Sequence, residues 1–480
     1  MRPATFPVRP EPSRPPRRLI RCGWLITMDG AAGAVRDSEI LVEGDRIAAV
    51  GHRLHATAEA VIDASRMIVM PGLVNMHLHT FQAGFRAVGS EWSAAGYFRH
   101  LYGNASTRFT PEDNFLGTYF GALNQLNQGV TTLFDYCHNI RSLEQAERSI
   151  DALEESGIRA VFALGRGIEA PERGGERPGA RQLPRDWVSS LRRGRLGDDQ
   201  ARVTMALGIA GPHWSDWDTT LANFRLARDF GLISSSHVTR AHAEGQVPDG
   251  YDRLAALGLL GPSHNLVHCN RLSVIEIARL VETGASITTT NSNELHDYPG
   301  HPATWRVIQA GGLPSTGIDV EAMVSGDFWR EMQTALLHAR HEALVEARET
   351  PPSIPLRSRD ALRWATEAGA RALGMEGRIG KIAPGAKADI IMLRADDLNL
   401  LPVHDPILAV VEQAHSGNVD AVLVDGVLRK SGGALLDDQT LRTQRGRDLQ
   451  ASVARLVREA ASTNQWRLQP DQPSSRTMHT

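Results

Sequence analysis

The chain has 480 residues, a formal net charge of −3 and 42% apolar residues. The lack of a basic excess argues against a nucleic-acid-binding protein. No uninterrupted apolar stretch of about 18 residues occurs, so we expect no membrane-spanning helix. The three cysteines form no even, closely spaced set, which predicts free thiols and a cytoplasmic location.

Both ends of the chain carry β-rich segments. Residues 1–18, rich in Arg and Pro, are predicted to form a disordered arm. Short β-rich runs punctuated by Gly and Asp fill residues 19–70, and a similar pattern returns in residues 376–435. Because chain termini commonly lie close together, we predict one small β-sandwich domain built from both segments. A C-terminal helix and polar tail are expected in residues 436–480.

Residues 71–375 alternate between apolar β-rich runs and helical patterns, which predicts parallel strands of an α/β fold. Eight such units favour a (β/α)8 TIM barrel over the alternative, a doubly wound open sheet. The predicted strands are Leu73–His77, Val130–Asp135, Ala160–Leu164, Val203–Ile209, Leu232–His237, Asn265–His268, Ser286–Thr290 and Leu313–Asp319.

Metal-capable side chains gather at the ends of these predicted strands, where barrel enzymes place their active sites. The candidates are His77, His79, Asp135, His138, His213, His237, His268, Glu294 and Asp319. His77 and His79 form an H-x-H pair, and residues two apart on a strand point to the same face. Two imidazoles on one face can bind one cation, although an isolated H-x-H pair is also compatible with unrelated polar residues.

Several motifs resemble the amidohydrolase superfamily. The segment "PGLVNMHLH" is similar to its entry into the first barrel strand, "GRIGKIAPGAKADIIML" to its β-domain, and "NLVHC" and "STGIDV" to its sixth and eighth strands. The closest branch contains cytosine, guanine and S-adenosylhomocysteine deaminases and triazine hydrolases.

This resemblance implies one divalent metal ion held by His77, His79, His237 and Asp319, with His268 contacting the metal-bound water or the substrate. Imidazole and carboxylate ligands suit Zn²⁺, our first expectation, or Fe²⁺. The ion would lower the pKa of a bound water, and Asp319 would act as general base. Lysine occurs only at Lys381, Lys387 and Lys430. A metal pair bridged by a carboxylated fourth-strand lysine is therefore excluded.

The sequence departs from the deaminase pattern at two positions. Those deaminases carry a glutamate three residues after the fifth-strand histidine, whereas Arg240 stands there in this chain, and a guanidinium cannot replace a carboxylic acid as proton donor. Glu294 occupies the place of a seventh-strand asparagine. We therefore predict Glu294 as a proton shuttle or as a clamp for a substrate cation, against a purely structural carboxylate.

Gln82, His138, His213 and Arg240 are the candidate substrate contacts. The aromatic loop 80–109 is a lid over the pocket, ordinary packing or a dimer contact. The leading function is hydrolysis of a C–N or related bond in a small nitrogenous molecule by a homodimer or higher homo-oligomer. Two alternatives stay open: a cyclising condensation that forms a heterocycle such as an imidazoline, and a non-catalytic scaffold of the same fold.

Overall fold

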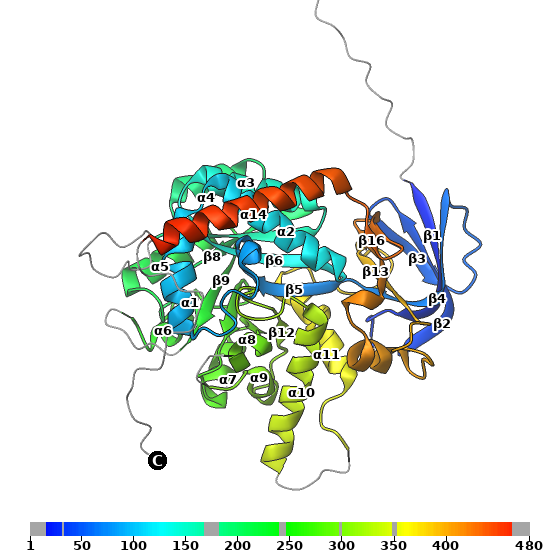
Figure 1. Ribbon diagram of the computed structural model, residues 1–480. Coiled ribbons are helices and arrows are strands. Elements are labelled where there is room, and N and C mark those ends of the chain that lie inside the picture. The colour runs from blue at the N-terminus through cyan, green and yellow to red at the C-terminus, as the bar shows by residue number, and fades with distance from the viewer. Residues whose placement is uncertain are drawn as a thin grey trace, which may run out of the picture.

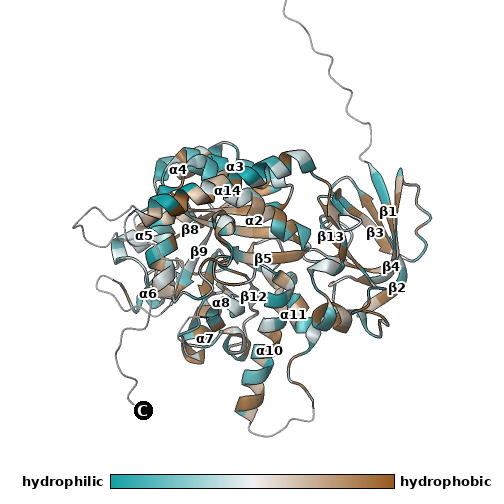
Figure 2. Cartoon of the chain, viewed as in Figure 1, coloured by the Kyte–Doolittle hydropathy of each residue, from teal (hydrophilic) through white to brown (hydrophobic). Residues whose placement is uncertain are grey.

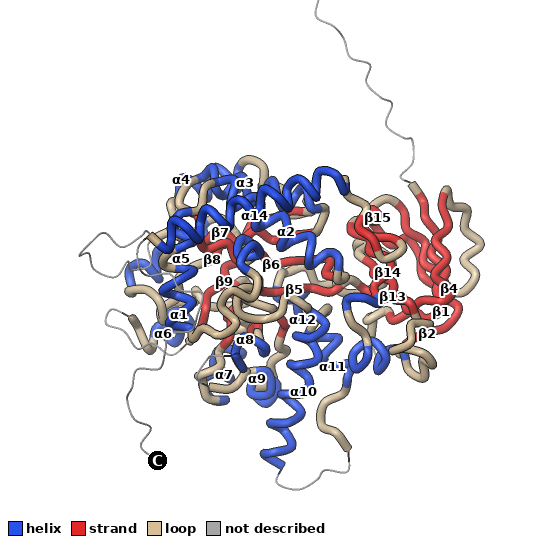
Figure 3. The backbone as a smooth tube through the Cα atoms, in the orientation of Figure 1, coloured by secondary structure: helices blue, strands red, loops and turns tan. Residues whose placement is uncertain are grey.

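The computed structural model describes residues 16–30, 33–167, 182–239, 246–296, 300–347 and 353–462. Two eight-stranded sheets organise these residues (Figures 1 and 3). One sheet is the parallel barrel in the body of the molecule, and the other forms the β-domain beside it. The predicted fold class is therefore confirmed.

The barrel strands are almost entirely buried because both of their faces are covered, and their apolar residues are interrupted by buried polar ones such as Asn75, Arg159 and Asn265. Figure 2 shows this hydrophobic colouring along β5. In spatial order they are β5 (Leu73–Leu78), β6 (Val130–Ile140), β7 (Arg159–Arg166), β8 (Val203–Gly208), β9 (Ile233–Val238), β10 (His264–His268), β11 (Ser286–Thr289) and β12 (Ser315–Thr316). A parallel bridge between Leu78 and Asp319 brings the chain after β12 back to β5. The eighth strand is shorter than predicted, and its last three predicted residues lie beyond β12.

Helices follow the strands and cover the outside of the barrel (Figure 1). Local signals set their ends: Thr110 and Asp113 form a capping box before one helix, and Gly157 ends another in the left-handed conformation with φ 79°. The longer helices are α2 (Pro111–Asn127), α3 (Leu143–Ser156), α4 (Arg185–Arg193), α5 (Trp217–Asp229), α6 (Gly250–Ala256), α7 (Val274–Glu282), α8 (Asn291–His296), α9 (Thr304–Gln309), α10 (Phe328–Ala347), α11 (Ser358–Trp364) and α12 (Glu367–Ala372).

Short helical turns occupy the loop after β5 and the β-domain connections. They are η1 (Thr80–Phe85), α1 (Ala94–Tyr97), η2 (Phe98–Tyr102), η3 (Ala105–Arg108), α13 (Pro406–Leu408), η4 (Ala409–Gln413) and η5 (Ser416–Asn418). The C-terminal helix α14 (Gln439–Ala461), red in Figure 1, packs against α2, η1 and η3. Among helices in the described part of the chain, none has the length and apolarity needed to cross a membrane.

The β-domain sheet draws strands from both parts of the sequence. Its order is β16 (Ala434–Leu435), β15 (Val427–Ser431), β14 (Val419–Val424), β13 (Ile390–Arg394), β4 (Ala60–Pro71), β1 (Arg17–Ile26), β2 (Ala34–Glu43) and β3 (Arg46–Gly51). Because β4 pairs with β1 on one side and β13 on the other, it joins the two segments directly. A bridge from Arg46 to Lys387 curls the sheet around a separate apolar core. Since β1 begins at Arg17, the last two residues of the predicted arm belong to this sheet.

A buried ion cluster fastens the β-domain to the barrel. Arg159, fully buried at the start of β7, donates hydrogen bonds of 2.7 and 3.1 Å to Asp389, which precedes β13. Asp425, in the turn between β14 and β15, accepts a further hydrogen bond from the same guanidinium. Removing the cation would therefore leave a buried carboxylate without its partner at the junction.

Arg159→Met is expected to lower the free energy of unfolding by about 3–5 kcal/mol, the usual effect of breaking a buried ion pair. Arg185→Met is the matched control because its pair with Asp229 is 2.8 Å long but exposed, and such pairs contribute about 0–1 kcal/mol. Urea unfolding of both variants measures the difference. Equal effects would show that the buried cluster does not stabilise the domain junction.

Candidate metal centre at the carboxyl rim of the barrel

The first barrel strand delivers two histidines to one point at the rim. His77 and His79 alternate with the buried Leu78, so both rings face the same side. His79 Nδ1 lies 2.7 Å from the carbonyl oxygen of Tyr136 and donates to it, which leaves Nε2 directed at Asp319, 3.1 Å away. A hydrogen bond on one ring nitrogen that presents the other is the usual way a protein orients a metal-binding histidine.

The eighth strand supplies Asp319 to the same point. Its Oδ1 lies 3.1 Å from His77 Nε2, and its backbone N–H donates to the His77 carbonyl at 2.9 Å. Gly317 makes this approach possible, because a Cβ atom there would lie only 2.7 Å from the Cβ atom of His77. Asp319 itself has φ 77°, an uncommon backbone conformation for a residue with a side chain and one that recurs at functional sites.

His237 at the end of β9 completes a group of four. One ligand atom from each of His77, His79, His237 and Asp319 lies within 4.8 Å of the others. Burial lowers the pKa of His77 to about 4 and holds that of His237 well below its usual value, so both rings are neutral near pH 7. Burial opposes ionisation of Asp319, but its close contacts with His77, His79 and His268 keep its pKa well below the usual range. Neutral imidazoles and a carboxylate form a donor set that fits a divalent transition metal.

His268 stands beside this group and is held by Glu294. Its Nε2 lies 3.8 Å from Asp319 Oδ2, while Nδ1 lies 3.1 Å from Thr290 Oγ1 and 3.2 Å from Glu294 Oε1. Although burial opposes protonation, the hydrogen bond that His268 donates to the Glu294 carboxylate and the charge of Asp319 raise the pKa of His268. A connected line of groups therefore runs from Glu294 through His268 to Asp319.

The position of Glu294 differs from the sequence prediction in one respect. It lies on α8 rather than at the end of the seventh strand, and its side chain is buried. Because the backbone turns into a helix directly after Thr290, Glu294 Oε1 accepts from the Thr290 N–H at 3.1 Å. Oε2 is buried and has no hydrogen-bond partner among the described residues.

Sequence reasoning missed three supporting groups. Asn293 donates its amide to Asp319 Oδ2, and Glu331 on α10 accepts backbone N–H groups of Asn291 and Ser292 at the start of α8. The Tyr136 ring packs 4.6 Å from that of His237. Only Asn293 left a signal in the sequence, as the polar run "NSN" directly before Glu294; the other two depend on tertiary contacts.

The structure places the candidate substrate contacts in different surroundings. His138 packs 4.1 Å from the His79 ring and 4.5 Å from Tyr102, so it borders the metal-capable group. Gln82 is buried and donates to the Tyr97 hydroxyl at 2.7 Å, while its own Oε1 is unpartnered among the described residues. His213 packs against Tyr251 with 5.0 Å between the ring centroids. Arg240 lies outside the described residues.

The loop 80–109 covers this part of the rim with aromatic side chains. Tyr97 and Tyr102 belong to its short helices, and Phe98 reaches across to Trp214 with 5.7 Å between ring centroids. Since Tyr102 contacts His138, the loop forms one wall beside the histidines. Phe81 and Phe85 are core residues, and the Phe81 ring also packs 5.4 Å from that of His138. The loop therefore combines ordinary packing with a wall of the candidate site.

Comparison with known proteins identifies the family. A model of the amidohydrolase family matches residues 68–429. This chain belongs to the amidohydrolase family. The membership agrees with the resemblance predicted from the strand motifs, and it confirms a metal-dependent hydrolase acting on carbon–nitrogen bonds of small molecules.

Two curated relatives illustrate the similarity of this amidohydrolase to enzymes of known activity. A 5-methylthioadenosine/S-adenosylhomocysteine deaminase of Pelotomaculum thermopropionicum is 29% identical over 89% of this chain and 96% of its own length. An 8-oxoguanine deaminase of Pseudomonas aeruginosa is 30% identical over 91% of this chain and 95% of its own length.

Solved structures confirm the fold of this amidohydrolase. An adenosine deaminase from Xanthomonas campestris with bound Zn has a TM-score of 0.78 at 21% identity and covers 93% of this chain and 99% of its own. Atrazine chlorohydrolase from Arthrobacter aurescens, in complex with zinc, has a TM-score of 0.75 at 23% identity over 91% of this chain and 100% of its own.

Proposed function

We propose that this amidohydrolase holds one divalent metal ion, with Zn²⁺ favoured over Fe²⁺, on His77, His79, His237 and Asp319. The convergence of these four ligand atoms within 4.8 Å carries the proposal. When bound, such an ion supplies an activated water for attack on an electrophilic carbon. The zinc in the two solved structures named above supports the choice of metal.

The side chains around this centre supply the general base and the general acid that the reaction needs. Asp319 is ionised and is the carboxylate that can take a proton from the attacking water. His268, within 3.8 Å of Asp319, is placed to hand a proton to the departing group. Glu294 positions His268 and favours its protonated form. This arrangement supplies a base and an acid without the fifth-strand glutamate that Arg240 replaces.

We propose an amino-substituted nitrogen heterocycle as the substrate class. The names of the curated relatives, which act on adenosine derivatives and 8-oxoguanine, support a heteroaromatic ring. The aromatic wall of Tyr97, Phe98 and Tyr102 suits a flat ring. Gln82 Oε1, which has no partner among the described residues, can accept a hydrogen bond from that ring. A homodimer or higher homo-oligomer remains our proposal for the assembly.

A screen of aminated heterocycles for ammonia release tests this function. Activity should disappear on chelation and return with Zn²⁺. Because Arg240 replaces the usual acid, we expect guanine, cytosine and adenosine to be poor substrates, with kcat/KM below about 10⁴ M⁻¹s⁻¹. Ammonia release that survives complete metal removal would contradict the proposal, and fast turnover of any of these three compounds would contradict the specificity prediction.

A further inference from the structure

A second group of metal-ligating side chains lies apart from the barrel centre. His301, His338 and Glu342 each offer one ligand atom, and these atoms lie within 4.8 Å of one another. His338 and Glu342 are four residues apart on α10, so they occupy one face of that helix on successive turns. His301 comes from the segment between α8 and α9 and is exposed. The group shares no residue with the first centre.

Two atoms of this group are buried and have no hydrogen-bond partner among the residues that the structure describes. His338 Nδ1 and Glu342 Oε2 lie 3.8 Å apart, and their side chains are only 11% and 19% exposed. Buried polar atoms are normally satisfied, and leaving one unpaired costs about 1–3 kcal/mol. The His301 ring stacks near that of His338 with 6.2 Å between centroids. A cation among the three side chains would satisfy the unpaired atoms.

The types of ligand atom in this group favour one class of metal ion. Two imidazoles and one carboxylate suit Zn²⁺, Ni²⁺ or Cu²⁺ rather than Mg²⁺ or Ca²⁺. Ligand atoms about 2.0–2.2 Å from zinc can be at most about 4.4 Å apart. Binding of an ion would therefore draw the three side chains closer together, and water can fill the remaining coordination positions.

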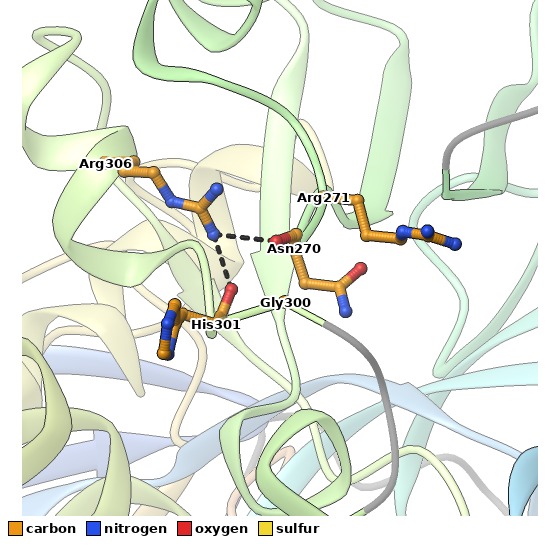
Figure 4. A pocket seen from close by; sticks show the side chains of 5 residues that line it. All are labelled: Asn270, Arg271, Gly300, His301 and Arg306. Carbon is orange, nitrogen blue, oxygen red and sulfur yellow. Dashed lines mark hydrogen bonds between the residues drawn. The ribbon is translucent and has the colours of Figure 1, made fainter. Parts of the chain in front are cut away.

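The guanidinium of Arg306 lies close enough to this group to act on His338. The Arg306 guanidinium donates to the carbonyl oxygens of Asn270 and His301, as Figure 4 shows. One turn further along α10, Glu346 accepts from Trp305 at 2.9 Å and offsets this positive charge. A pocket of about 320 Å³ opens beside His301 and is lined by Asn270, Arg271, Gly300, His301 and Arg306. Solvent can therefore reach the group from this side.

We propose that His301, His338 and Glu342 form a second, outer site for a transition-metal ion. An ion there would tie the segment after α8 to α10. The same helix already holds the start of α8 through Glu331, and α8 carries Glu294. The outer ion would thus brace the helix that positions His268, while the first centre would keep its own metal.

Calorimetric titration with Zn²⁺ tests this site on enzyme that has kept its first metal through gel filtration. Wild-type protein should bind a second equivalent and gain thermal stability. His301→Ala and Glu342→Gln should each weaken that second binding by about 100-fold or more, beyond the 10–100-fold typical of losing a supporting contact. Both variants should retain the first metal by elemental analysis.

His341→Ala is the matched control, because His341 is an exposed neighbour on the same helix and lies outside the group. It should bind the second equivalent like wild type. Failure of the wild type to take up a second ion would overturn the proposal, as would His341→Ala and His301→Ala having equal effects. Since the first metal is measured separately, the outcome does not depend on the proposed hydrolysis.

Discussion

Asp319→Asn is expected to lower kcat/KM by at least about 10⁴-fold. Asp319 combines two roles in the proposed centre, as a metal ligand and as the ionised base. One general base alone contributes about 10²–10⁴-fold, and a weakened metal site adds to this loss. Asparagine keeps the shape of the side chain but removes the charge that His77 and His79 stabilise. Initial rates on the best substrate and metal content by elemental analysis measure the two effects.

Asp135→Asn provides the control for Asp319→Asn. Asp135 is also a buried carboxylate at this rim, but its Oδ1 accepts from Thr80, with 2.6 Å to the hydroxyl, rather than from the histidine group. Its substitution should change kcat/KM by less than about tenfold, below the contribution of a general base. If Asp319→Asn stayed within tenfold of wild type, Asp319 would be neither an essential ligand nor the base.

Glu294→Gln is expected to keep the metal and the fold but to lower kcat by about 10²-fold, the lower end of the effect of a proton-transfer group. Glutamine can still accept from His268 Nδ1, so the geometry is retained while the charge is removed. That charge raises the pKa of His268. If protonated His268 donates to the leaving group, the rate falls as pH rises through this pKa. The falling limb of the pH–rate profile should therefore move to lower pH in the variant.

Glu331→Gln is the control for Glu294→Gln. It distinguishes an effect of the Glu294 charge on His268 from an effect of displacing α8. Glu331 is equally buried and anchors the first residues of the same helix, but it does not touch His268. Its substitution should lower stability while leaving the falling limb in place. If Glu294 instead binds a positively charged group of the substrate, Glu294→Gln should raise KM without shifting the falling limb of the pH–rate profile. Wild-type kcat, KM and pH profile in that variant would make Glu294 purely structural.

The sequence predicted the barrel strands because the patterns that indicate them are local and repeat along the chain. Alternating β-rich and helical segments identified the eight barrel strands, and His77, His79, His237 and Asp319 each lie at or just beyond the end of such a strand. Parallel strands in a barrel bring their carboxyl ends to one rim, so the meeting of these residues followed from topology.

Other features were not predictable because they depend on contacts between distant segments. No sequence pattern pairs Glu294 with His268, since the chain must turn into α8 immediately after β11. The roles of the Tyr136 carbonyl and of Glu331 likewise come from tertiary placement. The outer group shows the same limit: the spacing of His338 and Glu342 is visible in the sequence, but the position of His301 is not.

Anomalous diffraction at the zinc absorption edge, on crystals grown without added metal, tests the central claim most directly. We predict a peak within about 2.0–2.2 Å of a ligand atom from each of His77, His79, His237 and Asp319, at close to full occupancy. The same peak should vanish in crystals of His237→Ala. A fully active enzyme with no peak at these four residues would contradict the proposed metal centre.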